Sequence, residues 1–247
     1  MSRYKLVALD MDGTLLNEEK EISALNREAI CAALEAGVTV IFSTGRGIQS
    51  VLPYAKELGL QTPIVSVNGG EVWKSPGDLL MRKLLPTDLI RQMHEIAVKY
   101  NTWFWAYAVE GLFNKEQWTE QIDGIQWLKF GYYTEDEAAL QEIRVTLDSW
   151  GVLEIANSHP LNIEINPKGI SKVSGIEQVC ELLGIQMSEV IAMGDSENDI
   201  TMIQAAGLGV AMGNAQEKVK RIADIVTLTN DEHGVAEIIR KYVLRND

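Results

Sequence analysis

The chain carries a closely spaced pair of carboxylates that could perform nucleophilic and acid–base chemistry. Asp10 and Asp12 stand one residue apart, directly after the apolar run 6–9, and Gly13 frees the backbone to turn there. At such a site one carboxylate can attack an electrophile while the other moves a proton. Taken alone, the motif also fits a solvated turn, because Asp and Gly are common turn residues.

Three further apolar runs end in polar residues in the same way. Runs 38–42, 64–67 and 190–193 are short and continuous, which is typical of buried strands in a parallel sheet. In open α/β sheets, ligands bind beyond the carboxyl ends of the strands. If the four strands are parallel and adjacent, one crevice holds the polar residues that follow them: Asp10, Asp12, Thr44, Arg46, Asn68, Asp195 and Asp199.

Carboxylates gathered in one crevice need a countercharge. Two unit charges at about 4 Å repel by roughly 4 kcal/mol at an effective dielectric of about 20, so either some acids are protonated or a cation neutralises them. Oxygen ligands with no His or Cys nearby suit a hard ion, and Mg²⁺ takes one or two carboxylates together with waters and substrate phosphate. The sequence therefore favours a Mg²⁺ site.

Helical segments separate these runs and predict a doubly wound α/β fold. Ser23 is expected to cap a helix over 23–36, and a second helix is expected over 51–58 with Pro53 in its first turn. Runs 208–212 and 225–228 have strand character without an acidic ending. Strands that alternate with helices over short connections indicate a mostly parallel, Rossmann-like core.

The stretch 84–168 has a different pattern and is expected to form an inserted unit. Thr87 is expected to cap its first helix, and a second helix is expected over 135–150. Strands are expected at 103–109, 112–113, 127–133, 152–156 and 162–165. Clustered strands with two helices predict an α+β cap. The expected domains are a core of residues 1–83 and 169–247 and a cap of residues 84–168.

An aromatic strand candidate lies within this insert. In strand periodicity Trp103, Trp105 and Tyr107 share one face, while Phe104 and Ala106 share the other. One face must pack on the helices of the insert, and the other is free to cover the crevice. The sequence alone leaves open which set lines a pocket for the leaving group.

Four motifs follow one another along the chain. The first is the stretch 10–16, the second Ser43-Thr44-Gly45-Arg46, the third Lys172 after Ile170-Ser171, and the fourth 194–199 with Met202. Together they resemble the haloacid dehalogenase superfamily, and specifically its Cof-type phosphatases with a class IIB cap. The resemblance spans nearly the whole chain. It departs from the family at Val173, where glycine is usual.

The resemblance implies a phosphatase that acts on a small phosphorylated metabolite, such as a sugar phosphate, through an aspartyl-phosphate. Asp10 would be the nucleophile and a metal ligand. Asp12 would move the proton and offer its backbone carbonyl to Mg²⁺, while Thr44 and Lys172 would hold phosphoryl oxygens. The other expected site residues are Asp195 and Asp199 at the metal and Arg46, Asn68 and Asn198 at the substrate.

Composition limits the possible partners. The formal net charge of −13 argues against binding nucleic acid through a basic surface. Cys31 and Cys180 both lie in apolar helical patterns, so no disulfide is expected. The sequence shows no signal-peptide pattern and no apolar stretch of membrane-spanning length. We expect a cytoplasmic protein with neither nucleic acid nor membrane as a partner.

Other chemistries fit these motifs less well. Gly13 stands fourth from Asp10, whereas an EF-hand loop needs its glycine at the sixth position. A dinucleotide fingerprint that starts at Gly45 would have its third glycine at Ser50, and no G-x-S-x-G elbow occurs. Two rivals stay open: a phosphotransferase or phosphomutase with the same aspartyl-phosphate, and a non-catalytic binding protein of the same fold.

Overall fold

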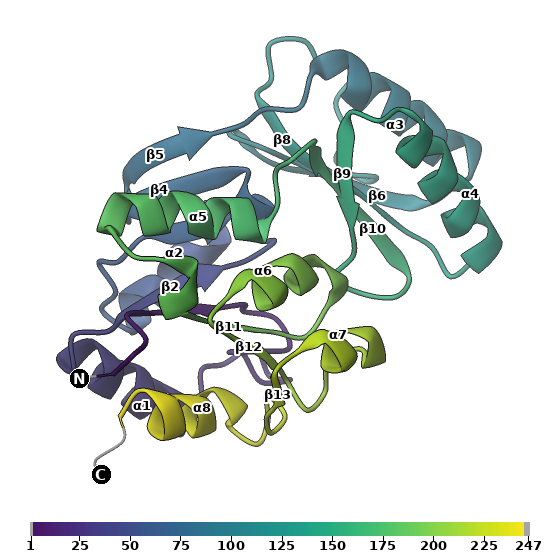
Figure 1. Ribbon diagram of the computed structural model, residues 1–247. Helices are drawn as coiled ribbons and strands as arrows, with labels where there is room; N and C mark the ends of the chain where they lie inside the picture. The colour runs from purple at the N-terminus through teal and green to yellow at the C-terminus, as the bar shows by residue number, and fades with distance from the viewer. Residues whose placement is uncertain (1, 245–247) are drawn as a thin grey trace.

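The computed structural model describes residues 2–244 and contains two sheets (Figure 1). The larger sheet has the strand order β13-β12-β11-β1-β2-β3-β4-β5. Neighbours from β13 to β3 run parallel, whereas β3, β4 and β5 are joined antiparallel. The strands are β1 (Leu6–Leu9), β2 (Thr39–Ser43), β3 (Ile64–Ser66), β4 (Glu71–Ser75), β5 (Asp78–Arg82), β11 (Val190–Gly194), β12 (Leu208–Ala211) and β13 (Ile225–Val226).

This sheet confirms the expected doubly wound core. The four runs that end in polar residues form β1, β2, β3 and β11, and these strands are parallel neighbours. The chain moves from β1 to β3 in one direction and from β11 to β13 in the other, so the strand order reverses between β1 and β11. Such a reversal opens a crevice at the carboxyl ends of the two strands.

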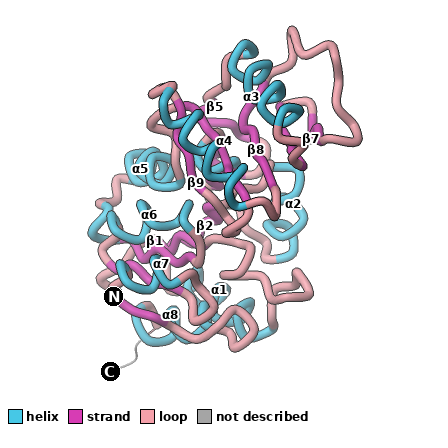
Figure 2. The backbone as a smooth tube through the Cα atoms, turned by 90° about the vertical axis from the view of Figure 1, so that its right-hand side faces the viewer, coloured by secondary structure: helices cyan, strands magenta, loops and turns pink. Residues whose placement is uncertain are grey.

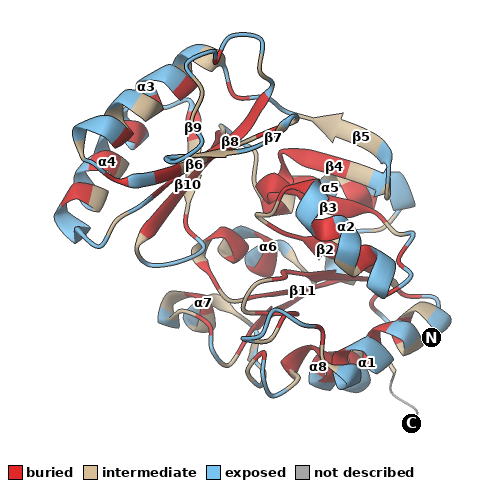
Figure 3. Ribbon diagram, turned by 180° about the vertical axis from the view of Figure 1, so that it is seen from behind, coloured by how far each residue is buried: buried red, intermediate tan, exposed pale blue. Residues whose placement is uncertain are grey.

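Helices cover both faces of the larger sheet. Helices α1 (Ala24–Glu35) and α8 (Gly234–Tyr242) pack together on one face, and α5 (Lys172–Leu183) and α6 (Ile200–Ala205) lie on the other (Figure 1). Strands covered on both faces are apolar throughout, and every residue of β1 and β11 is buried (Figure 3).

Local sequence explains where these helices begin. Ser23 is extended and its hydroxyl accepts a hydrogen bond from the N–H of Asn26, so α1 begins where expected. Helix α2 (Ile48–Glu57) begins earlier than expected, because Gly47 is extended and serves as its N-cap. Pro53 consequently lies inside the helix, and its expected place in the first turn is wrong.

Two further expectations about local structure need correction. Thr87 is the first residue of α3 (Thr87–Lys99) and not its cap; Pro86, whose ring fixes φ near −58°, takes the cap position. The hairpin of β4 and β5, which turns at Gly77 with φ of 92°, was not expected from the sequence. Buried Glu71 in β4 pairs with Arg82 of β5, so this hairpin lacks the apolar run that marked the other strands.

The smaller sheet, which we call the cap sheet, is antiparallel with the order β7-β6-β8-β10-β9. Its strands are β6 (Trp103–Ala108), β7 (Gly111–Asn114), β8 (Trp127–Tyr133), β9 (Leu153–Ala156) and β10 (Asn162–Pro167). Helices α3 and α4 (Glu137–Ser149) cover the face turned away from the larger sheet (Figure 1). Figure 2 shows β1 and β2 in the lower half of the molecule and β8 and β9 in the upper half.

The burial pattern of β6 answers the question that the sequence left open. Phe104 is buried in the same apolar cluster as Met93 of α3 and Ile143 of α4. Trp105 and Tyr107 lie on the opposite face and line a cavity between the two sheets. The face of the cap sheet that carries Trp105 and Tyr107 is therefore the face that covers the crevice.

No helix within residues 2–244 is both long and apolar enough to cross a membrane.

Candidate active site

Three carboxylates meet at the point where the strand order reverses. Asp10 follows β1, Asp195 follows β11, and Asp199 is the last residue of the short 3-10 helix η3 (Glu197–Asp199). Each of the three offers an oxygen within 4.8 Å of the others. Gly13 permits this approach, because its φ is 78° and a Cβ at this position would lie 2.7 Å from Oδ2 of Asp195. The sequence analysis expected these three acids to converge.

Lys172 neutralises part of this cluster. It is the first residue of α5, it is 1% exposed, and its Nζ lies 2.6 Å from Oδ1 of Asp10 and 2.6 Å from Oδ1 of Asp199. Burial alone would lower the pKa of Lys172, but the two carboxylates outweigh burial and raise it. Lys172 therefore stays a cation between Asp10 and Asp199.

One lysine does not neutralise three carboxylates, and the pKa values of Asp10 and Asp195 are raised as a result. Burial raises the pKa of Asp10 well above its ordinary value. Lys172 acts to lower this pKa, while the charges of Asp199 and Asp195 act to raise it further. Burial and the charge of Asp199 raise the pKa of Asp195 to about 7. A divalent cation would relieve both effects, and the donors are all oxygens. The residues present fit a Mg²⁺ ion.

The carboxylate of Asp12 is turned away from this cluster. It accepts hydrogen bonds from Nε and Nη2 of Arg46, both at 2.7 Å, and one from Nζ of Lys20 at 3.1 Å. Burial acts to raise the pKa of Asp12, but the two cations outweigh it and the pKa is lowered. Arg46 also lies over the ring of Tyr54, with 5.3 Å between Cζ and the ring centroid.

The turn after β3 links the loop of Thr44 to the cap sheet. Val67 and Asn68 both have positive φ, 53° and 55°, which is strained for a β-branched residue. The N–H of Asn68 donates to the carbonyl of Thr44, while its side-chain amide donates to Glu164 of β10 at 2.6 Å. The amide of Asn198 in turn donates to Oδ1 of Asn68 at 3.3 Å.

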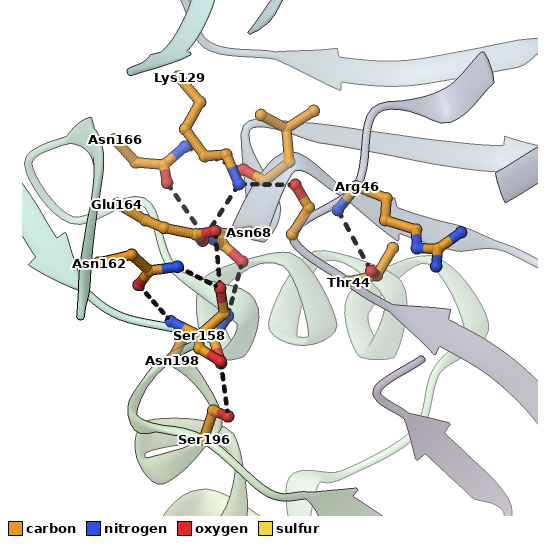
Figure 4. Close-up of polar contacts among 12 residues, drawn as sticks. Thr44, Arg46, Asn68, Lys129, Ser158, Asn162, Glu164, Asn166, Ser196 and Asn198 are labelled. Atoms are coloured by element: carbon orange, nitrogen blue, oxygen red, sulfur yellow. Dashed lines mark hydrogen bonds and ion pairs between the residues drawn. The ribbon is translucent and has the colours of Figure 1, made fainter. Parts of the chain in front are cut away.

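A cavity of about 250 Å³ lies above the carboxylates. Core residues form its floor, namely Asp10, Asp12, Thr44, Gly45, Arg46, Asp195, Ser196 and Asn198. The cap sheet and the β9–β10 connection form its roof, namely Trp105, Tyr107, Lys129, Ser158, Asn162 and Glu164. Figure 4 shows Lys129, Ser158, Asn162 and Glu164 of this roof together with Thr44 and Arg46 of the floor. Asn68 and Lys172 lie behind this cavity, along a neighbouring one of about 210 Å³. The side-chain amide of Asn68 is already hydrogen-bonded to Glu164. A contact between Asn68 and the substrate therefore stays a prediction.

This roof contains a buried ion pair that was not expected from the sequence. Nζ of Lys129 lies 3.1 Å from Oε2 of Glu164 and 2.7 Å from the carbonyl oxygen of Gly45. Burial lowers the pKa of Lys129 despite the charge of Glu164. Lys129 stands between Leu128 and Phe130, and Glu164 stands between Ile163 and Ile165. A charged residue between two apolar neighbours of a strand is the signal that could have identified them.

The family model of the haloacid dehalogenase-like hydrolases matches residues 7–137 and 113–239. The chain belongs to this family. It is 49% identical over 240 residues to the 5-amino-6-(5-phospho-D-ribitylamino)uracil phosphatase YcsE of Bacillus subtilis, covering 97% of this chain and 96% of the relative. The expected family and the expected enzyme class, a phosphatase, are confirmed.

Solved structures agree on the fold. A haloacid dehalogenase-like hydrolase from B. subtilis has a TM-score of 0.88 at 26% identity, covering 96% of this chain and 99% of that one. The subclass IIB sugar phosphatase BT4131 has a TM-score of 0.85 at 24% identity, covering 96% and 98%. The core with a class IIB cap, expected from the sequence, is confirmed.

A cluster of charged side chains connects helix α4, which packs on the cap sheet, to the core of the phosphatase. Glu197, in the loop between Asp195 and Asn198, pairs with Arg144 of α4 and with Lys218 of α7 (Glu217–Ile222). Oε2 of Glu197 also accepts a hydrogen bond from Asn157 at 2.8 Å. Burial acts to raise the pKa of Glu197, but its two cations outweigh it and lower the pKa.

The departure at Val173 has a structural explanation. In this phosphatase α5 lies close against β3 at Gly175, where a Cβ would lie 2.4 Å from Val65. Val173 is partly buried against the core. A side chain is therefore accommodated at position 173, and Lys172 reaches Asp10 and Asp199 all the same.

Proposed function

We propose that the phosphatase cleaves a phosphate monoester in two steps, through an aspartyl-phosphate on Asp10 and with Mg²⁺ as cofactor. The observation that carries this proposal is the position of Asp10 on the floor of the cavity, against Lys172 and beside Asp195. A buried carboxylate beside a cation and a metal site is suited to attack phosphorus, because positioning and charge neutralisation dominate phosphoryl transfer.

In the first step a carboxylate oxygen of Asp10 attacks phosphorus and the bond to the leaving oxygen breaks. Asp12 gives its proton to that oxygen, so the products are an aspartyl-phosphate and an alcohol. Thr44, Arg46 and Asn198 line the floor and are proposed to hold the phosphoryl oxygens. Lys172 would offset the charge of Asp10 from behind.

In the second step the roles of Asp12 reverse. Asp12 takes a proton from a water molecule, the water oxygen attacks phosphorus, and the bond between phosphorus and Asp10 breaks. Inorganic phosphate and free Asp10 result. Asp10 and Asp195 would hold Mg²⁺ with the backbone carbonyl of Asp12, and Asp199 would lie just behind them. When bound, the ion neutralises charge on the phosphoryl oxygens.

We further propose that the substrate is 5-amino-6-(5-phospho-D-ribitylamino)uracil, and that residues 84–168 form the cap that selects it. This substrate is named for the relative that is 49% identical over almost the whole chain. The roof of the cavity also suits a ring on a polyol chain, because it combines two aromatic side chains with charged and amide groups.

Asp12→Asn separates the two chemical steps. With p-nitrophenyl phosphate, whose leaving group needs no proton, this variant should release about one nitrophenolate per enzyme and then stop, because hydrolysis of the intermediate needs Asp12. Asp10→Asn should give no such burst while keeping the circular dichroism spectrum of the wild type. Full turnover by Asp10→Asn would refute the role of Asp10.

The substrate and the rival functions are tested with the wild type. We expect kcat/KM for the phosphoribitylamino-uracil to exceed that for D-ribitol 5-phosphate at least tenfold, with release of inorganic phosphate. Equal values would refute the proposed substrate. Transfer of phosphate to an added sugar without free phosphate would favour a phosphotransferase or phosphomutase, and no activity on a panel of monoesters would favour a binding protein.

A further inference from the structure

Gly131 of β8 is a glycine for reasons of space. It lies between Trp105 of β6 and Glu164 of β10, directly opposite each in the register of the cap sheet. Its φ is not among the positive values, so its backbone is open to any residue. A Cβ at this position would lie 2.3, 2.4 and 2.9 Å from Cζ2, Cε2 and Cη2 of Trp105. Only a glycine leaves room for the indole where it now lies.

The distances also give the orientation of the indole. The three carbons are consecutive atoms of its six-membered ring and lie at similar distances, so the ring lies face-on over Gly131. Trp105 is at the same time half-buried and lines the cavity. One face of the indole thus rests on the cap sheet and its exposed part borders the cavity.

Polar groups surround this aromatic surface. Lys129, Asn162 and Glu164 line the same cavity from β8 and β10. Within residues 2–244, Nε1 of Trp105 donates no hydrogen bond to the protein. A flat indole beside donors and acceptors is the arrangement that recognises a planar heterocycle, by stacking on its face and hydrogen bonding to its edge.

We propose that Gly131 is a positioning residue for specificity: by letting the Trp105 indole lie flat on β8, it leaves the space in which the planar ring of the leaving group stacks. This inference rests on the proposed substrate. The alternative is that Gly131 serves packing alone and that Trp105 could stand elsewhere without effect on substrate choice.

A methyl group at position 131 separates the two possibilities. In Gly131→Ala the indole must swing away, because the end of a side chain moves more easily than the backbone of a central strand. The ratio of kcat/KM for the phosphoribitylamino-uracil to kcat/KM for D-ribitol 5-phosphate should fall about tenfold, mainly through KM. Trp105→Ala should lower the same ratio to a similar extent.

The double variant tests whether Gly131 acts through Trp105. In Trp105→Ala/Gly131→Ala the methyl group meets no indole, so the ratio should equal that of Trp105→Ala, and the strain of Gly131→Ala should be relieved. Val98→Ala, on the exposed side of α3, is the control and should keep the wild-type ratio.

Each outcome bears on one proposal. If the wild type prefers the ring substrate and Gly131→Ala keeps that preference, or if the two single effects add in the double variant, the inference about Gly131 is overturned. If the wild type shows no preference for the ring, the proposed substrate fails first and this inference with it. A tenfold loss in Gly131→Ala, together with no further loss when Gly131→Ala is added to Trp105→Ala, supports the inference.

Discussion

Arg46 holds the carboxylate of Asp12 through two hydrogen bonds, from Nε to Oδ2 and from Nη2 to Oδ1, each 2.7 Å long. The same fork of donors fits a phosphate group. If Arg46 turns to an incoming phosphate, Asp12 loses its strongest cation and its pKa rises toward the range of a proton donor. The resting arrangement therefore keeps Asp12 charged until a substrate competes for Arg46.

Arg46→Lys tests this competition. Lysine keeps the charge but offers no planar fork, so kcat/KM should fall about 10- to 100-fold. Because the pKa of Asp12 is lowered mainly by hydrogen bonds from Arg46, the alkaline limb of the profile of kcat/KM against pH should move to higher pH. Arg27→Lys, in a pair with Glu57 on the surface, is the matched control. An unshifted alkaline limb would contradict the coupling of Arg46 to Asp12.

Lys172→Met should harm both activity and stability. The substitution keeps the length of the side chain but leaves Asp10 and Asp199 without their buried cation. Removing one partner of a buried pair costs about 3–5 kcal/mol, so urea unfolding at pH 7.5 without Mg²⁺ should show a loss of roughly that size. Activity should fall at least 100-fold.

The loss of stability in Lys172→Met should be smaller at pH 5.5 than at pH 7.5. Burial and the neighbouring carboxylates raise the pKa of Asp10, so lowering the pH favours protonation of Asp10 in the folded variant more than in the unfolded chain. Lys168→Met, which removes an exposed lysine near Glu154, should unfold like the wild type. Wild-type stability of Lys172→Met at pH 7.5 would argue that Lys172 is not needed to offset the carboxylates.

The floor of the cavity could be predicted because its residues directly follow the ends of strands. Asp10, Thr44 and Asp195 each follow an apolar run, and parallel strands bring such ends together without further information. The turn of Gly13 was likewise visible in the sequence and has the positive φ that such a turn needs.

The roof could not be predicted in the same way. Asn68 and Glu164 are hydrogen-bonded although they are 96 positions apart, and the contact depends on how the cap sheet lies over the core. The partner of Asp12 was hidden for a related reason, since Arg46 could reach either a carboxylate or a phosphate from its place after β2. Periodicity placed Trp105 and Tyr107 on one face, but only packing against α3 and α4 decided which way that face points.

Mg²⁺ should stabilise the protein more at pH 8 than at pH 6. The pKa of Asp195, about 7 when folded, lies above its ordinary value of 3.8. Between these values the folded protein holds a proton that the unfolded chain has lost, so the free energy of unfolding of the metal-free protein falls as pH rises. At pH 6 Mg²⁺ must displace that proton, whereas at pH 8 the carboxylate is already free.

Differential scanning calorimetry with about 5 mM Mg²⁺, and again with a chelator, measures the stabilisation by Mg²⁺. We expect Mg²⁺ to raise Tm by about 3–6 °C at pH 8 and by less than half as much at pH 6. Asp195→Asn should lose the Mg²⁺ effect at both pH values. An equal rise in Tm at pH 6 and pH 8 for the wild type would count against Asp195 as a ligand that must lose a proton.

The pair of Arg144 and Glu197 should hold the cap against the core. Glu197 lies within the loop of Asp195 and Asn198, and α4 reaches this loop through Arg144. Lys218 still pairs with Glu197 in Arg144→Met, and one partly exposed ion pair is worth about 0.5–1 kcal/mol, so its loss would shift a closing equilibrium by roughly 2- to 5-fold. Arg144→Met should therefore raise KM about 2- to 5-fold and change kcat much less.

Ionic strength separates this electrostatic contact from simple packing of the arginine stem. Because salt screens partly exposed charges, KM of the wild type should rise between about 50 mM and 500 mM NaCl, and KM of Arg144→Met should rise less. Arg91→Met removes an arginine that pairs with Asp123 on the cap surface and has no ion-pair partner among the described residues of the core, so it should keep the wild-type response. If Arg144→Met and Arg91→Met respond to salt alike, the cap is held by contacts other than this pair.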